Sequence, residues 1–191
     1  LASFYYVQVL LDNKEYAKVI EIINGIEKFK EFSKKESRWG IFLADAYFQI
    51  GKINLCIETI KDYLEKSPKD LYLNQYYIQI LTLQKNYEEA ISHYRFMSAN
   101  KLIDFSDIEV AEKMAILNIQ AGKYIDADNF IDSLKERNPN SYNYLNGLKE
   151  KKKKNYKAAE KFLKKIEKKN KLYIDSIKKI SEIKIQKKDY M

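Results

Sequence analysis

The side chains best suited to catalysis are one thiol, Cys56, and one imidazole, His93, each the only residue of its type in the 191-residue chain. A nucleophile and a general base act together only when they lie within hydrogen-bonding reach of each other and of an orienting group. Cys56 occupies a position that recurs as small along the chain, and His93 lies in the middle of a predicted helix one repeat later. We therefore interpret Cys56 as a core thiol and His93 as a surface imidazole.

The other polar residues form no recognisable catalytic or cofactor site. One His and one Cys are too few for a zinc site of the usual kind, and no Asp-rich calcium loop occurs. The five glycines are isolated from one another, so no glycine-rich loop could cradle a phosphate. We therefore predict a protein that is not an enzyme and that uses no cofactor, no metal and no small-molecule substrate.

The composition predicts a helical protein. Hydrophobic residues make up 46% of the chain, which is enough for a continuous core, whereas two Pro and five Gly are too few for the many tight turns of an all-β protein. No segment approaches the roughly 20 apolar residues that span a bilayer. Because the sequence opens with Leu1 and stops one residue after Tyr190, we expect it to be an excerpt of a longer chain, and cytoplasmic and periplasmic locations both stay open.

A spaced signature recurs along the chain and marks an internal repeat. Each copy begins with Tyr or Ile, has a small residue three places later and a large apolar residue four places after that. The five copies are Tyr16-Val19-Ile23, Ile53-Cys56-Ile60, Tyr87-Ala90-Tyr94, Tyr124-Ala127-Ile131 and Tyr156-Ala159-Leu163, and Tyr190 begins a sixth. The lead residues are 37, 34, 37, 32 and 34 positions apart. Repeats of this length are typical of stacked supersecondary units.

The positions around this signature resemble the tetratricopeptide repeat (TPR), a 34-residue helix–turn–helix unit. The family's small position in the first helix is matched by Ala44, Ala115 and Gly147, its turn glycine by Gly51 and Gly122, and its closing proline by Pro68 and Pro139. Three positions depart from the pattern: Trp39 lies one place early, Ile53 replaces the lead Tyr, and Asn118 stands where an apolar residue is usual.

The resemblance implies an all-α, right-handed α-solenoid of about five TPR-like repeats plus a partial sixth, forming one domain over residues 1–191. The expected repeats are 1–33, 37–70, 71–104, 108–141, 142–173 and the partial 174–191. The spacings of 37 predict insertions near Phe32–Ser37 and Ala99–Ser106.

In the resembling family, the first helices line a concave groove that holds a peptide or a helix. Carried over by repeat position, the groove residues here are Tyr5, Gln8, Arg38, Asp45, Tyr72, Gln75, Tyr76, Gln79, Glu112 and Gln120. The alternative is that some of them only pack repeats together. The paired Lys and Asn with which some family members capture a C-terminal carboxylate are not found at the matching positions.

Basic charge is concentrated at the carboxyl end. Residues 149–191 contain 17 Lys and six acidic residues, a net charge of +11, whereas residues 1–148 carry −3, and the two add to the +8 of the whole chain. Within this segment, Lys151, Lys152, Lys153 and Lys154 fall at the end of a predicted first helix and its turn. They are either a solvated helix end or a patch for a polyanion. Nucleic acid is disfavoured because only three of the 35 basic residues are Arg.

These observations predict a non-enzymatic TPR scaffold or adaptor that binds a protein or peptide partner through a concave groove, as part of a larger complex. The alternative is an adaptor for an anionic membrane surface or another polyanion, such as an acidic protein, that uses the Lys-rich C-terminal repeats. A third possibility is a regulatory or catalytic domain outside this sequence.

Overall fold

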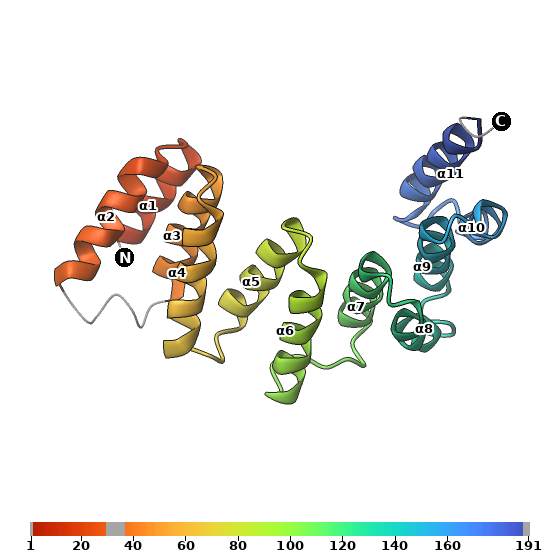
Figure 1. Ribbon diagram of the computed structural model, residues 1–191, viewed down its shortest axis with the longest axis horizontal. Coiled ribbons are helices and arrows are strands. Elements are labelled where there is room, and N and C mark those ends of the chain that lie inside the picture. Colours follow the sequence, from red (N-terminus) through yellow and green to blue (C-terminus); the bar gives the residue numbers. More distant parts are fainter. Residues whose placement is uncertain (1, 30–36, 189–191) are drawn as a thin grey trace. The chain divides into compact units, whose positions relative to one another are not determined.

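The computed structural model describes residues 2–29 and 37–188, and every regular element in that part of the chain is an α-helix (Figure 1). The all-α prediction is confirmed. The chain divides into two compact units, residues 1–86 and 87–191, which we call the N-terminal and the C-terminal unit. The extent of a single solenoid domain and the repeat boundaries stay predictions.

The N-terminal unit contains α1 (Ala2–Asp12), α2 (Tyr16–Phe29), α3 (Ser37–Gln49), α4 (Ile53–Lys66) and α5 (Leu71–Leu83). The C-terminal unit contains α6 (Tyr87–Ala99), α7 (Ile108–Ala121), α8 (Tyr124–Ser133), α9 (Pro139–Lys152), α10 (Tyr156–Leu163) and α11 (Tyr173–Lys188). The insertion predicted near Ala99–Ser106 corresponds to the connection between α6 and α7. The other predicted insertion falls largely outside the described residues, as does Tyr190.

The lead residue of each repeat is the first residue of a second helix, as predicted: α2, α4, α6, α8 and α10 begin at Tyr16, Ile53, Tyr87, Tyr124 and Tyr156. The small residues that follow have no exposed surface; they are Val19, Cys56, Ala90, Ala127 and Ala159. The large apolar residues four places later are buried as well. In the repeats whose two helices lie in the same unit, one turn of the second helix thus faces the first helix at close range.

Two glycines in first helices show how close this approach is. A Cβ at Gly40 of α3 would lie 2.5–2.8 Å from ring atoms of Tyr63 in α4. A Cβ at Gly147 of α9 would lie 2.6 Å from two side-chain atoms of Leu163 in α10. Any larger side chain at either position would push the paired helices apart.

The turn inside each repeat uses one backbone conformation. The residue two places before the lead residue has a positive φ in every case; these residues are Lys14, Gly51, Lys85, Gly122 and Lys154. The next N–H bonds back across the turn, as from Lys123 to the carbonyl of Asn118 and from Asn155 to that of Glu150, both at 2.8 Å. This is the Schellman closure of a helix C-terminus. Glycine adopts the left-handed conformation without strain, whereas lysine does so at a cost.

The departure at Asn118 leaves a polar atom without a partner. Its side chain is buried, its Nδ2 donates to the Met114 carbonyl at 2.8 Å, and its Oδ1 accepts no hydrogen bond from any residue that the structure describes. The equivalent positions in two other repeats, six places before the lead residue, are Leu10 and Leu81, both buried.

We expect the Asn118→Leu variant to unfold with a free energy about 1 kcal/mol higher, because the buried unpaired oxygen is removed. Asn74→Leu serves as the control, because the buried Asn74 amide donates to the carbonyls of Pro68 at 3.0 Å and Asp70 at 2.6 Å. That variant should lose stability. Urea denaturation of both would check the sign, and a destabilised Asn118→Leu protein would contradict the prediction.

Candidate partner-binding surfaces

The predicted groove residues of the N-terminal unit lie on α1, α3 and α5, the first helices of their repeats. Tyr72, Gln75 and Gln79 are exposed, and their three- and four-residue spacing places them along one face of α5. Tyr72 keeps 75% of its surface exposed, and Tyr5 on α1 keeps 70%. Gln8 on α1 is also exposed. These residues present rings and amides to solvent.

Three other predicted groove residues hold first helices together. The Tyr76 hydroxyl on α5 donates to Asp45 Oδ1 on α3 at 3.2 Å, and burial, followed by the charge of Asp45, raises the pKa of Tyr76 far above its ordinary value. The Arg38 guanidinium lies 4.2 Å from the ring centroid of Phe4. For Tyr76, Asp45 and Arg38, these contacts support the packing alternative.

In the C-terminal unit, Glu112 and Gln120 both connect α7 to α9. Glu112 accepts hydrogen bonds from Asn138, the residue that precedes α9, and from the Ser141 hydroxyl. Gln120 is exposed, and its Oε1 accepts from Lys152 Nζ at 3.4 Å. Glu112 therefore has a packing role, whereas Gln120 lies beside the predicted basic patch.

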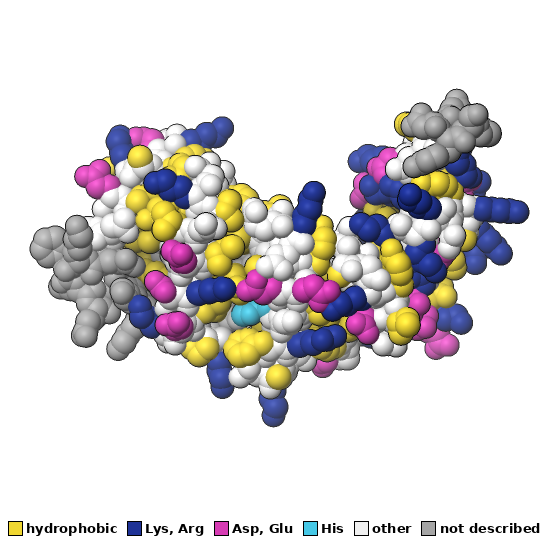
Figure 2. Space-filling model, in the orientation of Figure 1, with side chains coloured by type: hydrophobic (Ala, Val, Ile, Leu, Met, Phe, Trp, Pro, Cys, Tyr) yellow, Lys and Arg dark blue, Asp and Glu magenta, His cyan; other side chains and the backbone are white. Residues whose placement is uncertain are grey.

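A groove of about 390 Å³ runs along these first helices, and we call it the lysine groove. Its polar lining consists of Lys151, Lys152, Lys154, Lys179, Gln120 and Gln186, and its apolar lining consists of Ile119, Tyr144, Leu148 and Tyr156. The residues come from α7, α9, α11, the turn before α10 and the first residue of α10. Dark blue basic side chains gather over this end of the C-terminal unit (Figure 2).

The lysine groove combines two predicted sites that the sequence suggested separately. Gln120 from the groove prediction meets Lys151, Lys152 and Lys154 from the basic-patch prediction. Lys153 does not line the groove: its ammonium lies 3.5 Å from Glu150 and 5.8 Å from the centroid of the Tyr124 ring.

Sequence reasoning missed Lys179 and Gln186 on α11, although the repeat offset contains the signal for Gln186. Gln120 lies four places before the lead residue Tyr124, Lys152 four before Tyr156, and Gln186 four before Tyr190. Applying the groove positions to the last two first helices would have selected Lys152 and Gln186.

One carboxylate, that of Glu182 on α11, is bonded to two of the lysines that line the groove. Glu182 accepts hydrogen bonds from Lys151 and from Lys179, the latter at 2.9 Å. These bonds lower the pKa of the Glu182 carboxyl, and the bond to Glu182 raises the pKa of Lys179. Lys151 has 19% of its side chain exposed, so it is the most enclosed of the four lysines in the run 151–154.

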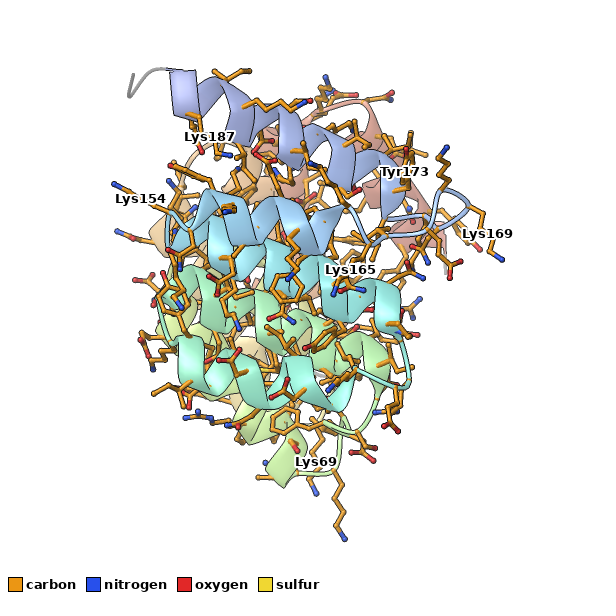
Figure 3. The ribbon with its side chains drawn as sticks, turned by 90° about the vertical axis from the view of Figure 1, so that its right-hand side faces the viewer. Lys69, Lys154, Lys165, Lys169, Tyr173 and Lys187 are labelled. Carbon is orange, nitrogen blue, oxygen red and sulfur yellow. The ribbon has the colours of Figure 1, made fainter. Side chains whose placement is uncertain are left out.

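Among the described residues, the remaining groove lysines have no carboxylate partner. Lys152 donates to the neutral Gln120, and within the part of the chain that the structure describes no ion pair involves Lys154. Lys154 and Lys187 lie at one end of the C-terminal helices, and Lys165, Lys169 and Tyr173 lie at the opposite end (Figure 3). The groove lysines are thus separate from the lysines in the connection between α10 and α11.

Cys56 is buried, as predicted, and burial, followed by the charge of Asp45, raises the pKa of its thiol to about 11. His93 reaches the surface, as predicted, but only in part: the imidazole is half-buried, its ring centroid lies 5.5 Å from that of Phe96, and burial lowers its pKa. No cluster of three His, Cys, Asp or Glu residues that could hold a metal occurs in residues 2–29 and 37–188.

We expect Cys56 to react slowly with a thiol reagent in the native protein and rapidly in denaturant, because only the exposed thiolate is a good nucleophile. Timed labelling with a chromogenic disulfide reagent would measure both rates. Rapid stoichiometric labelling of the native protein would place the thiol at the surface.

Among the described helices, none combines the length and the apolar character that crossing a bilayer requires.

Comparison with known proteins finds its matches among solved structures. A TPR protein from Parabacteroides merdae superposes with a TM-score of 0.68 and 16% identity, over 86% of this chain and 65% of its own. The C-terminal part of a TPR repeat-containing protein from Cytophaga hutchinsonii superposes with a TM-score of 0.59 and 20% identity, over 95% of this chain and 64% of its own. A double mutant of MamA RS-1 superposes with a TM-score of 0.61 and 11% identity, over 96% of this chain and 93% of its own.

The chain thus spans slightly less than two thirds of the Parabacteroides and Cytophaga structures. A scan against protein-family models and a search of curated protein sequences find no match. At identities of 11–20%, structural likeness carries information about the fold alone. Together with the five in-phase copies of the repeat signature, it shows that the chain has the fold of the tetratricopeptide repeat proteins, an α-helical solenoid.

Proposed function

We propose that the chain is a non-enzymatic scaffold that binds a segment of a protein partner along the exposed faces of its first helices, within a larger complex. The observation that carries this proposal is the row of Tyr72, Gln75 and Gln79 on α5, which is exposed although α5 also contributes several buried residues to the core. Tyrosine rings give contact area at low entropy cost, and amides hydrogen-bond an extended backbone. The row is suited to holding a peptide.

The TPR fold supports this kind of role, since repeat proteins of this type present preformed extended surfaces. Absence of catalysis is part of the proposal. Cys56 is buried with a raised pKa, so it is poorly suited to act as a nucleophile.

The test compares a triple variant, Tyr72→Ala with Gln75→Ala and Gln79→Ala, with a control that changes exposed residues of a second helix, Asn54→Ala with Leu55→Ala. Affinity capture from the source lysate, quantified by mass spectrometry, would identify partners of the wild type. We expect the triple variant to lose at least one of them and the control to keep them all, with both melting like the wild type. Identical partner sets for all three proteins would overturn the proposal.

A further inference from the structure

We propose that the lysine groove of the C-terminal unit binds an acidic segment of a protein partner. Side-chain carboxylates of that segment would lie at the groove lysines, and an apolar side chain would lie against Tyr144, Leu148 and Tyr156. This inference rests on the proposed scaffold function and names the chemistry of one partner.

The groove already shows how it holds a carboxylate. Lys151 from α9 and Lys179 from α11 converge on the side chain of Glu182, which accepts a hydrogen bond from each. Charge-assisted bonds of this kind are shorter and stronger than neutral ones. The first helices are therefore spaced so that ammonium groups on neighbouring repeats meet at one carboxylate.

The groove has more positive charge than the protein itself neutralises. The four lysines that line it carry a charge of +4, and Glu182, which pairs with two of them, carries −1. The net charge is therefore +3, and Lys152 and Lys154 account for two of these three positive charges. Recessed charges of one sign focus an electrostatic potential that attracts the opposite charge. A ligand with several carboxylates would relieve the repulsion among these ammonium groups.

The shape and lining of the groove favour a protein segment over other polyanions. The lysines line a hollow of about 390 Å³ together with two tyrosines and two amides, whereas the flat surface of a bilayer would contact protruding lysines such as Lys169. The lining contains no Arg, which is the residue suited to paired hydrogen bonds with bases and phosphates. Acidic side chains separated by apolar ones match both parts of the lining.

The test measures fluorescence anisotropy of a labelled peptide in which Glu alternates with Leu, with a Gln-for-Glu twin as the uncharged probe. The groove variant is Lys152→Gln with Lys154→Gln, which avoids the enclosed Lys151. Its matched control, Lys153→Gln with Lys157→Gln, removes the same charge from neighbouring exposed lysines that do not line the groove. Thermal melting confirms that all variants are folded.

We expect the wild type to bind the Glu peptide, to bind its Gln twin much more weakly, and to lose affinity steeply between about 50 and about 300 mM salt. The groove variant should bind about tenfold more weakly, and the control should stay within about twofold of the wild type. Glu182→Gln should bind about threefold more tightly, because the internal carboxylate no longer competes for Lys151 and Lys179.

Equal losses in the groove variant and the control would overturn the inference, because the attraction would then be a property of net charge. Absence of Glu-peptide binding would also overturn it, and binding of phosphatidylserine vesicles that disappears in the groove variant would then assign the lysines to a membrane. The α5 triple variant separates this inference from the scaffold function. If that variant loses a captured partner while the Glu peptide does not bind, only the inference about the groove fails.

Discussion

The Ala159→Trp variant is expected to unfold with a free energy lower than that of the wild type by about 1–3 kcal/mol or more. Ala159 on α10 is fully buried, and its carbonyl oxygen lies 3.5 Å from the position that a Cβ on Gly147 of α9 would occupy. An indole cannot enter this contact unless α9 and α10 separate. The same substitution at Ala90, the equivalent residue of α6, should have an effect of similar size.

Thermal and urea denaturation would measure the loss. Ala158→Trp is the matched control, because this neighbouring alanine is half-exposed on the same helix. We expect the control to melt near the wild type. If Ala90→Trp and Ala159→Trp both kept the wild-type midpoint, the small position would not be the helix contact described here.

The second large effect is expected at Gly40, where alanine should destabilise the protein by about 1–3 kcal/mol. Replacing a helical glycine with alanine ordinarily stabilises a helix by up to about 1 kcal/mol. At Gly40 the added methyl group would meet the buried Tyr63 ring at 2.5–2.8 Å, and a packed ring cannot move aside as the end of a flexible side chain can. Steric repulsion should therefore outweigh the gain in helix propensity and make the change in stability unfavourable.

Gly25→Ala provides the opposite expectation. Among the described residues, and apart from the neighbouring residues and the backbone of α2 itself, no atom lies within 4 Å of the position of a Cβ on Gly25, so this variant should gain stability. Denaturation of the two alanine variants would compare the signs directly. A Gly40→Ala protein as stable as Gly25→Ala would show that α3 and α4 can separate at little cost.

The starts of the second helices could be predicted from the sequence because one strong signal repeats five times in phase. Tyr87 and Ala90 have the same relation to each other as Tyr156 and Ala159, and each pair identifies a helix start and a buried contact. The burial of Cys56 followed from its place in the same series. The periodicity of a sequence indicates which face of a helix is buried, and the burial of these residues depends on the face on which they lie.

The candidate surfaces were less predictable because they depend on contacts between side chains of different repeats. Asp45 and Tyr76 lie on the first-helix positions expected to face a groove, yet they bond to each other. The bond from Lys151 to Glu182 depends on where α11 lies against α9, and one sequence does not fix that placement. The orientation of His93 likewise depends on its packing beside Phe96.

The pairs of helices that pack closely are adjacent in the chain, as α9 and α10 are, or one helix apart, as α7 and α9 are. Within each unit these contacts therefore close only short loops, which favours fast folding from more than one starting point. Helices at the end of such an array can open without disturbing distant ones, so hydrogen exchange should report a gradient of protection along the chain. A partner that contacts both α9 and α11 would connect two successive repeats, and its binding would be measurable as slower hydrogen exchange in both helices.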